Sequence, residues 1–139
     1  MTDDLRQTGT ETRRRVLGDA HVARSQANAT PFDAPFINLI TDAAWGHVWS
    51  RDTLAPRERS MITLALLAGL GNEEEFRLHL RATRNTGATA ADVRDVLLHV
   101  AIYAGVPRAN TAFRIAREVY AEMGIDLGRE IAGEPGEGA

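Results

Sequence analysis

Apolar residues recur every three or four positions along most of this chain, a spacing that is typical of amphipathic helices. The pattern predicts helices over residues 31–51, 56–70, 73–86, 90–104 and 107–123, after a shorter helix that ends at Leu17. Proline opens some of these segments and glycine closes others, which matches the residue preferences of helix ends. No segment alternates convincingly with a period of two. We therefore expect an all-α fold of about six to eight helices.

The two ends of the chain lack this apolar pattern. Residues 1–11 are polar and are expected to be flexible, and residues 12–126 are expected to form a single helical domain. The tail over residues 127–139 is rich in Gly and Glu, with too little apolar content to fold, so we expect it to be disordered. Because no strand is predicted, the chain offers no place for a Rossmann-type or P-loop nucleotide site.

The segment MITLALLAGL, residues 61–70, is apolar on nearly every side of its predicted helix. A helix without a polar face is buried, either in a core or between subunits. Trp45 and Trp49, four residues apart, are read as core or interface anchors, with the lining of a pocket as the alternative. This amount of apolar surface predicts a homo-oligomer. The segment is too short to cross a membrane, which takes about 20 residues.

Composition narrows the possible chemistry, because the chain contains neither cysteine nor lysine. A thiolate nucleophile, a redox dithiol and a lysine Schiff base are therefore excluded, and an enzyme of this composition works by acid–base chemistry and electrostatics. The net charge of −3 argues against non-specific nucleic-acid binding, and the densest basic run, Arg13-Arg14-Arg15, is interpreted as a solvated helix face. The polar start lacks a signal-peptide core, so we expect a cytoplasmic protein that does not insert into a membrane.

Two histidines lie among apolar residues of predicted helices, each with a carboxylate four positions earlier. Glu75 and His79 are neighbours on one helix surface, where the carboxylate would hold the imidazole and fix its tautomer. A core histidine bonded to a single partner is the alternative. Asp95, His99 and Tyr103 repeat this spacing on the next helix, and His99 is expected to be partly buried.

A metal site is not predicted from these residues. Glu75, His79 and His99 are a possible set of metal ligands, but they come from two helices without a close His-x-x-x-His or Glu-x-x-His spacing. Two arginines, Arg57 and Arg59, lie in the first turn of the helix that begins at Pro56. A buried arginine requires an anionic partner, so Arg57 or Arg59 is expected to meet a carboxylate or a ligand.

Five segments of the chain, taken together and in this order, resemble the 4-carboxymuconolactone decarboxylase family. They are LGDAHVARS (residues 17–25), AWGHVWSR (44–51), RSMIT (59–63), FRLHLRAT (76–83) and YAGVPRAN (103–110). The resemblance covers roughly residues 12–123, and the order of several motifs makes it more specific than any one of them. It implies the AhpD-like helical fold and a hexamer built as a trimer of dimers.

The resemblance also implies site residues. The AhpD branch of the superfamily carries Cys-x-x-Cys-x-x-x-His with a glutamate upstream. In this chain the histidine position falls on His79, the cysteine positions fall on Asn72 and Glu75, and the upstream glutamate falls near Glu58. The redox dithiol is therefore absent, whereas the glutamate and the histidine remain. We expect His79, Glu75 and Glu58 to form the catalytic group.

The implied reaction is the loss of CO₂ from a lactone dicarboxylate, giving 3-oxoadipate enol-lactone in the β-ketoadipate pathway of protocatechuate breakdown. The lactone carbonyl accepts the electrons, so no cofactor and no metal are expected. The expected substrate-binding residues are Arg59, Arg51, Arg24, His99, Tyr103 and Trp45. The alternatives are a decarboxylase of a related lactone or β-keto acid, and a non-catalytic or redox helical oligomer.

Overall fold

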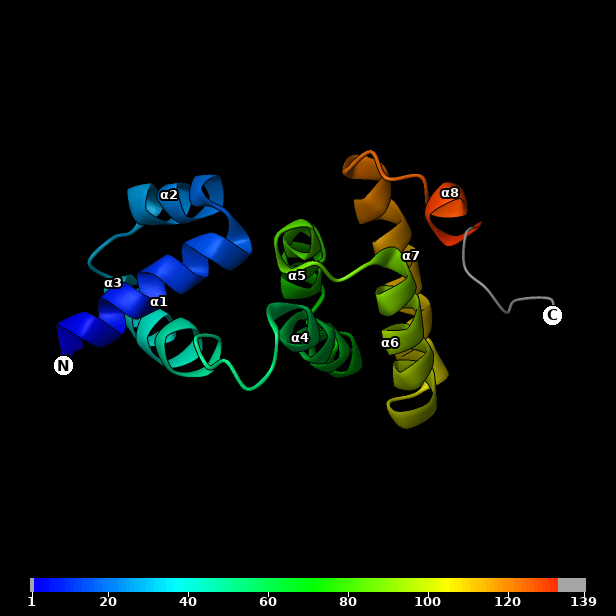
Figure 1. Ribbon diagram of the computed structural model, residues 1–139, viewed down its shortest axis with the longest axis horizontal. Coiled ribbons are helices and arrows are strands. Elements are labelled where there is room, and N and C mark those ends of the chain that lie inside the picture. The colour runs from blue at the N-terminus through cyan, green and yellow to red at the C-terminus, as the bar shows by residue number, and fades with distance from the viewer. Residues whose placement is uncertain (1, 133–139) are drawn as a thin grey trace. The chain divides into compact units, whose positions relative to one another are not determined.

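The structure is a computed structural model that describes residues 2–132 of the chain. Within these residues it contains eight α-helices, one π-helix and no strand, so the predicted all-α fold is confirmed (Figure 1). The elements are α1 (Thr2–Leu17), α2 (Asp19–Asn28), α3 (Ala34–Ile40), the π-helix η1 (Thr41–Val48), α4 (Pro56–Leu70), α5 (Glu73–Thr86), α6 (Ala90–Tyr103), α7 (Val106–Glu122) and α8 (Leu127–Ala132).

The chain divides into two compact units, residues 1–59 and residues 60–139, and helix α4 belongs to both. The sequence predicted a single helical domain over residues 12–126 and showed no sign of a boundary near residue 59. Each unit is therefore described by itself. No helix in the described part of the chain is long and apolar enough to cross a membrane.

In the first unit, α1 packs mainly against η1, and two glycines allow the two helices to approach closely. A Cβ atom at Gly9 would collide with the backbone carbonyl of Thr41. A Cβ atom at Gly46 would lie 2.8 Å from the carbonyl oxygen of Leu5. Any side chain at either glycine would therefore force the two helices apart, since real Cβ atoms do not make contacts this short.

The prediction of a flexible segment is wrong for the described part of residues 1–11, because α1 begins at Thr2. The low apolar content of this segment concealed a helix that tertiary contacts stabilise. The side chain of Arg6 donates to both carboxylate oxygens of Asp42 on η1, at 2.6 Å and 2.8 Å. Val16 at the other end of α1 is 2% exposed.

The helix expected over residues 31–51 is present but shorter and irregular. Helix α3 begins at Ala34, and from Thr41 the hydrogen-bond pattern widens to the π type, in which the amide of Trp49 donates to the carbonyl of Ala44 at 2.8 Å. The inward side of η1 carries Thr41, Trp45 and Gly46, all of them buried. Hydrophobic periodicity does not distinguish an α-helix that continues from one that widens, so the sequence did not predict this change.

The interpretation of Arg13-Arg14-Arg15 as a solvated face of α1 is wrong for one of the three residues. Arg14 and Arg15 are exposed, whereas Arg13 is only 6% exposed. Three consecutive helical residues point in directions about 100° apart, so one of the three turns inward on the side that faces the rest of the unit. The charge pattern alone gives no indication of which arginine this is.

The core of the second unit is formed by α4, α5, α6 and α7. Its fully buried side chains include Leu64, Phe76, Leu80, Leu97 and Ile115. Helix α7 packs against both α5 and α6, and α8 packs against α6. These helices place the site residues of the second unit on rigid elements.

Helix α4 is buried on one side only. Leu64 and Ala68 lie in the core, but Ile62, Leu66 and Leu70 on the other side are 49%, 58% and 67% exposed. The sequence predicted burial either in a core or between subunits. Within the single chain, the core covers only half of this apolar helix.

The C-terminal segment is partly helical, which corrects the prediction of disorder over residues 127–139. Helix α8 spans Leu127–Ala132, and residues 133–139 lie outside the described residues. Asp126 stabilises the start of α8, because its side chain accepts a hydrogen bond from the amide of Arg129 at 3.2 Å. Ile125, just before the helix, and Leu127, its first residue, pack against the core of the second unit.

Candidate active site

Helix α5 holds His79 in a buried position, as its place on an apolar helix face predicted. The residue is 7% exposed, and its neighbours Phe76 and Leu80 are 1% and 0% exposed. The opposite side of α5 is fixed to α7 by ion pairs from Arg77 and Arg81, whose partners Glu118 and Glu122 lie at 2.6 Å and 3.2 Å. Burial removes the imidazole from bulk water, which strengthens its electrostatic interactions with any bound group.

Glu75 lies one turn before His79 but does not hold it in this structure. The residue is exposed, and it makes no hydrogen bond or ion pair with any residue in the described part of the chain. A carboxylate in water gains at most a few tenths of a kcal/mol from a neighbour one helical turn away, so hydration competes successfully. The predicted contact between Glu75 and His79 is therefore not formed within the described chain.

Glu58 and Arg59 stabilise the start of α4 and the loop before it. One carboxylate oxygen of Glu58 accepts a hydrogen bond from the amide of Ala55 at 2.8 Å. The guanidinium of Arg59 donates to the backbone carbonyl of Arg51 from Nε at 3.3 Å and from Nη2 at 3.1 Å. The structure thus brings Arg59 to the main chain of Arg51, while the side chain of Arg51 is exposed.

Trp45 and Arg24 occupy different environments in the first unit. Trp45 is 6% exposed on η1, and its ring centroid lies 5.2 Å from that of Trp49, which supports the interpretation of a core anchor. Arg24 is exposed on α2 and makes no hydrogen bond or ion pair with a described residue. Its guanidinium is therefore available to a ligand.

His99 and Tyr103 lie together on the surface of α6. Their rings stack with centroids 5.3 Å apart and an angle of 26° between their planes. The prediction that His99 is partly buried is wrong, because Val96, Leu97 and Val100 face the core and His99 lies on the opposite side with Tyr103, which is 82% exposed.

A groove of about 370 Å³ between α4 and α6 includes this aromatic pair. Its walls are Ala65, Leu66, Gly69 and Leu70 from α4 and His99, Val100, Tyr103 and Ala104 from α6. The volume is within the range of small-molecule sites, about 300–1,000 Å³. The two polar rings are the groups in this groove that could orient a ligand.

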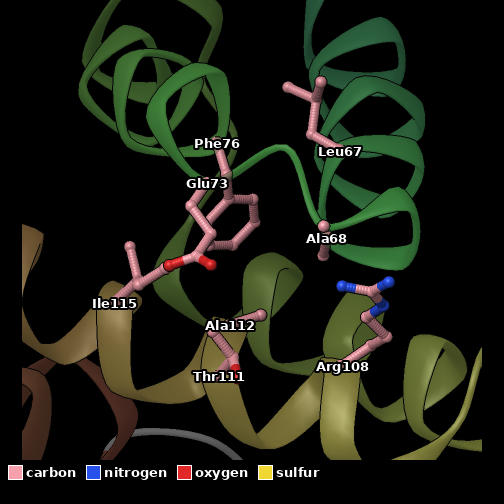
Figure 2. A pocket seen from close by; sticks show the side chains of 9 residues that line it. Leu67, Ala68, Glu73, Phe76, Arg108, Thr111, Ala112 and Ile115 are labelled. Carbon is pink, nitrogen blue, oxygen red and sulfur yellow. The ribbon is translucent and has the colours of Figure 1, made fainter.

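A smaller pocket lies between α4, α5 and α7 (Figure 2). Glu73 and Arg108 are its charged residues, and both side chains point into it from the starts of their helices. Its volume is about 40 Å³, which is enough for one or two water molecules and far too little for a lactone. None of the predicted site residues lines this pocket.

The predicted site residues are distributed over both units. The first unit carries Arg24, Trp45, Arg51, Glu58 and Arg59, and the second carries Glu75, His79, His99 and Tyr103. Within the described residues, no three His, Asp or Glu side chains lie close enough together to hold a metal ion. The arrangement offers a buried imidazole, an exposed imidazole–phenol pair and several arginines, which suit proton transfer and the binding of carboxylates.

Comparison with known proteins gives a consistent assignment. A sequence model of the Carboxymuconolactone decarboxylase family matches residues 34–118. The 4-carboxymuconolactone decarboxylase of Acinetobacter baylyi is 44% identical over 126 residues, which cover 90% of this chain and 94% of that protein. The nitrosuccinic acid decarboxylase npaB of Metarhizium robertsii is 38% identical over 120 residues, covering 86% and 83% of the two chains. On its sequence and its helical fold, this chain belongs to the carboxymuconolactone decarboxylase family.

Proposed function

We propose that the chain is a carboxy-lyase that converts 4-carboxymuconolactone to 3-oxoadipate enol-lactone and CO₂, a step of protocatechuate breakdown. The observation that carries this proposal is the 44% identity to the A. baylyi decarboxylase along nearly the whole of both chains. The cytoplasmic location, expected from the polar start of the sequence, stays a prediction.

The substrate supplies its own electron sink, so the protein has to bind, orient and transfer a proton. The bond from the ring carbon to the departing carboxylate breaks, and its electron pair moves through the ring double bond to the lactone carbonyl. CO₂ leaves, and the resulting enolate takes one proton at the α carbon to give the enol-lactone. For this reaction the protein has to supply an acid, a hydrogen-bond donor to the developing oxyanion and a cationic group that binds the remaining carboxylate.

His79 suits the role of proton donor or oxyanion partner. It is buried on α5, whereas His47 and His99 are exposed, and a desolvated donor stabilises developing charge more than a hydrated one. Glu75 and Glu58 are the proposed positioning residues for His79. Because Glu75 is exposed in the single chain, its role requires that substrate or a neighbouring subunit displaces its water.

The remaining predicted residues are proposed to bind the substrate. Two carboxylates call for cationic partners, and Arg59 is the first candidate because its planar guanidinium binds a carboxylate through two hydrogen bonds. Arg51 and Arg24 are exposed and open to ligand. The stacked pair of His99 and Tyr103, with Trp45, is proposed to contact the ring.

A homo-oligomer is proposed from the apolar surface of the second unit. Seven large apolar or aromatic residues of α4, α6 and α7 are at least 49% exposed: Ile62, Leu66, Leu70, Leu98, Ile102, Tyr103 and Val106. An apolar surface of this extent marks an interaction site in most soluble proteins. The hexamer, a trimer of dimers, is the assembly that the family resemblance implies.

A second candidate substrate is nitrosuccinate, because npaB is named as its decarboxylase and is 38% identical to this chain. Nitrosuccinate also offers an electron acceptor next to the scissile bond, in this case the nitro group. The lower identity makes it the weaker candidate. It belongs to the same reaction class, so a direct comparison of the two substrates is needed.

One assay tests both candidates. The lactone is made in situ from carboxymuconate and its cycloisomerase, and its loss is followed by absorbance with and without the purified protein; nitrosuccinate is offered separately. We expect the higher kcat/KM with the lactone, and an unchanged rate after dialysis against EDTA. Turnover of nitrosuccinate alone would refute the lactone assignment, and activity that EDTA removes and one divalent metal restores would refute the metal-free mechanism.

A further inference from the structure

The first unit contains a buried arginine that forms no ion pair with any acidic side chain in the described part of the chain. Arg13 on α1 is 6% exposed, and its Nη2 donates to the hydroxyl of Ser25 on α2 at 3.0 Å. Its Nε atom is buried and has no hydrogen-bond partner among the described residues. Burial lowers the pKa of Arg13, and no neighbouring carboxylate opposes that shift.

A cavity of about 320 Å³ adjoins this guanidinium, and we call it the Arg13 cavity. It lies within the first unit, between α1, α2, α3 and the start of η1. The neutral polar side chains on its wall are Thr10, Gln26, Asn38 and Thr41, and its lining residues include no Asp or Glu.

The second arginine on the wall of the cavity is already neutralised. Arg6 forms the ion pair with Asp42, through bonds of 2.6 Å and 2.8 Å, so its charge is compensated without a ligand. Among residues 2–132, the side-chain partner of the Arg13 guanidinium is the neutral hydroxyl of Ser25. The Arg13 cavity therefore carries one uncompensated positive charge.

An arginine cannot lose its proton in order to become neutral inside a protein, so a buried guanidinium has to be matched by an anion. A planar carboxylate fits the guanidinium fork through two parallel hydrogen bonds. A phosphate would carry between one and two negative charges at neutral pH and leave the cavity with an excess of negative charge. The apolar wall residues Val22 and Ile37 suit a carbon skeleton rather than an inorganic ion.

We propose that the Arg13 cavity is a binding site for a small organic acid, held by one carboxylate on the guanidinium of Arg13 with its carbon chain against Val22 and Ile37. A volume of about 320 Å³ is at the lower end of small-molecule sites, which suits an acid of a few carbons. The amides of Gln26 and Asn38 are the donors for a second polar group on the ligand. This inference rests on the cavity and not on the proposed decarboxylase activity.

The bound acid has two possible sources, the substrate of the reaction itself or a separate organic acid. The chemistry that recognises them is the same, because each presents a carboxylate on a short carbon frame. Kinetics of variants at Arg13 distinguish them. A substrate subsite raises the KM for the lactone when the charge is removed, whereas a separate site leaves that KM unchanged while binding of the acid is lost.

The direct test is calorimetric titration of the full chain with pentanoate, with pentanamide as the neutral control and inorganic phosphate as the tetrahedral anion. We expect saturable pentanoate binding with a Kd on the order of 1 mM, and at least tenfold weaker binding of the other two. In a nitrogen–proton NMR spectrum of the arginine Nε–H groups, pentanoate should shift the signal of Arg13. No binding of pentanoate, or equal binding of pentanamide, would overturn the proposal.

A pair of adjacent variants provides the matched comparison. Arg13→Gln and Arg14→Gln remove the same charge from the same helix, but Arg14 is exposed. Arg13→Gln should abolish pentanoate binding, and Arg14→Gln should leave it within about twofold of the unmodified chain, since a hydrated surface charge contributes little. Equal binding by both variants would contradict the proposal. If Arg13→Gln does not fold, the comparison of pentanoate with pentanamide on the unmodified chain decides the question.

Discussion

Tyr120 on α7 is a residue whose ionisation is linked to folding. Its side chain is buried, with 3% of the residue exposed, and burial raises the pKa of Tyr120 to about 12. In an unfolded chain a tyrosine has a pKa near 10. The folded state therefore holds this proton to higher pH, and the contribution to stability is present below about pH 10 and lost as the pH rises through about 12.

We predict that the chain loses on the order of 2–3 kcal/mol of unfolding free energy between about pH 9 and pH 12 through this one residue. Urea unfolding at both pH values measures the loss, and Tyr120→Phe should be less sensitive to pH by that amount. The chain contains no lysine and no cysteine, so no side chain of either type adds its own titration to the measured pH dependence in this range. Tyr103→Phe, at an exposed position, is the matched control, and equal slopes for both variants would contradict the prediction.

At the scale of single residues, the sequence predicted positions on helix faces better than contacts. The burial of His79 followed from Phe76 and Leu80 on either side of it. The exposure of His99 did not follow, because its neighbours in sequence are apolar on both sides of α6, and the sequence does not show which side the core covers. The burial of Arg13 was missed for the same reason, since an arginine run resembles a solvated face.

Among the elements, α6 begins with a capping box, in which Thr89 and Asp92 exchange two hydrogen bonds. The hydroxyl of Thr89 accepts from the amide of Asp92 at 3.0 Å, and the carboxylate of Asp92 accepts from the amide of Thr89 at 2.9 Å. Asn72 occupies the same position before α5, but its side chain makes no capping hydrogen bond. The identity of a residue thus locates a helix end without fixing its hydrogen bonds.

Thr89→Ala should lower the free energy of unfolding by about 1 kcal/mol, because the exposed amide of Asp92 loses its acceptor at the helix start. Chemical denaturation monitored by circular dichroism measures this change. Thr53→Ala, an exposed threonine outside the helices, is the control and should have little effect. A Thr89→Ala protein as stable as the control would mean that water replaces the cap without cost.

The elements that the sequence missed are those stabilised by distant contacts. Helix α1 has few apolar residues, and it depends on close packing at Gly9 and Gly46 and on the ion pair of Arg6 with Asp42. Small residues that allow helices to approach leave no hydrophobic periodicity, so the segment resembled a frayed end. Helix α8 has six residues, too few to show a hydrophobic period, and its first residue, Leu127, packs against the core.

For the molecule as a whole, the exposed apolar surface of α4 and α6 is the feature that indicates association with other subunits. Leu66 is 58% exposed and forms part of the wall of the groove that contains His99 and Tyr103. If this surface meets another subunit, the groove becomes enclosed and its polar groups become desolvated. Assembly and activity would then be linked.

We predict that light scattering finds a homo-oligomer at micromolar concentration and that Leu66→Glu reduces its mass, because a buried carboxylate in an apolar contact is strongly unfavourable. Leu66→Met keeps the apolar character and should keep the assembly. A stable monomer for the unmodified chain, or an oligomer that tolerates Leu66→Glu, would contradict this account of the surface.

The most direct test of the account is the kcat of His79→Ala with 4-carboxymuconolactone, measured on protein shown to be folded and assembled. If His79 stabilises developing charge or donates the proton, kcat should fall about a hundredfold, corresponding to about 3 kcal/mol. His79→Gln should recover part of a hydrogen-bonding role and none of a proton-donating one. His47→Ala, at an exposed position of η1, should stay near the unmodified rate. A His79→Ala protein that keeps most of its kcat would mean that this histidine is structural, and His99 with Tyr103 would become the leading candidates.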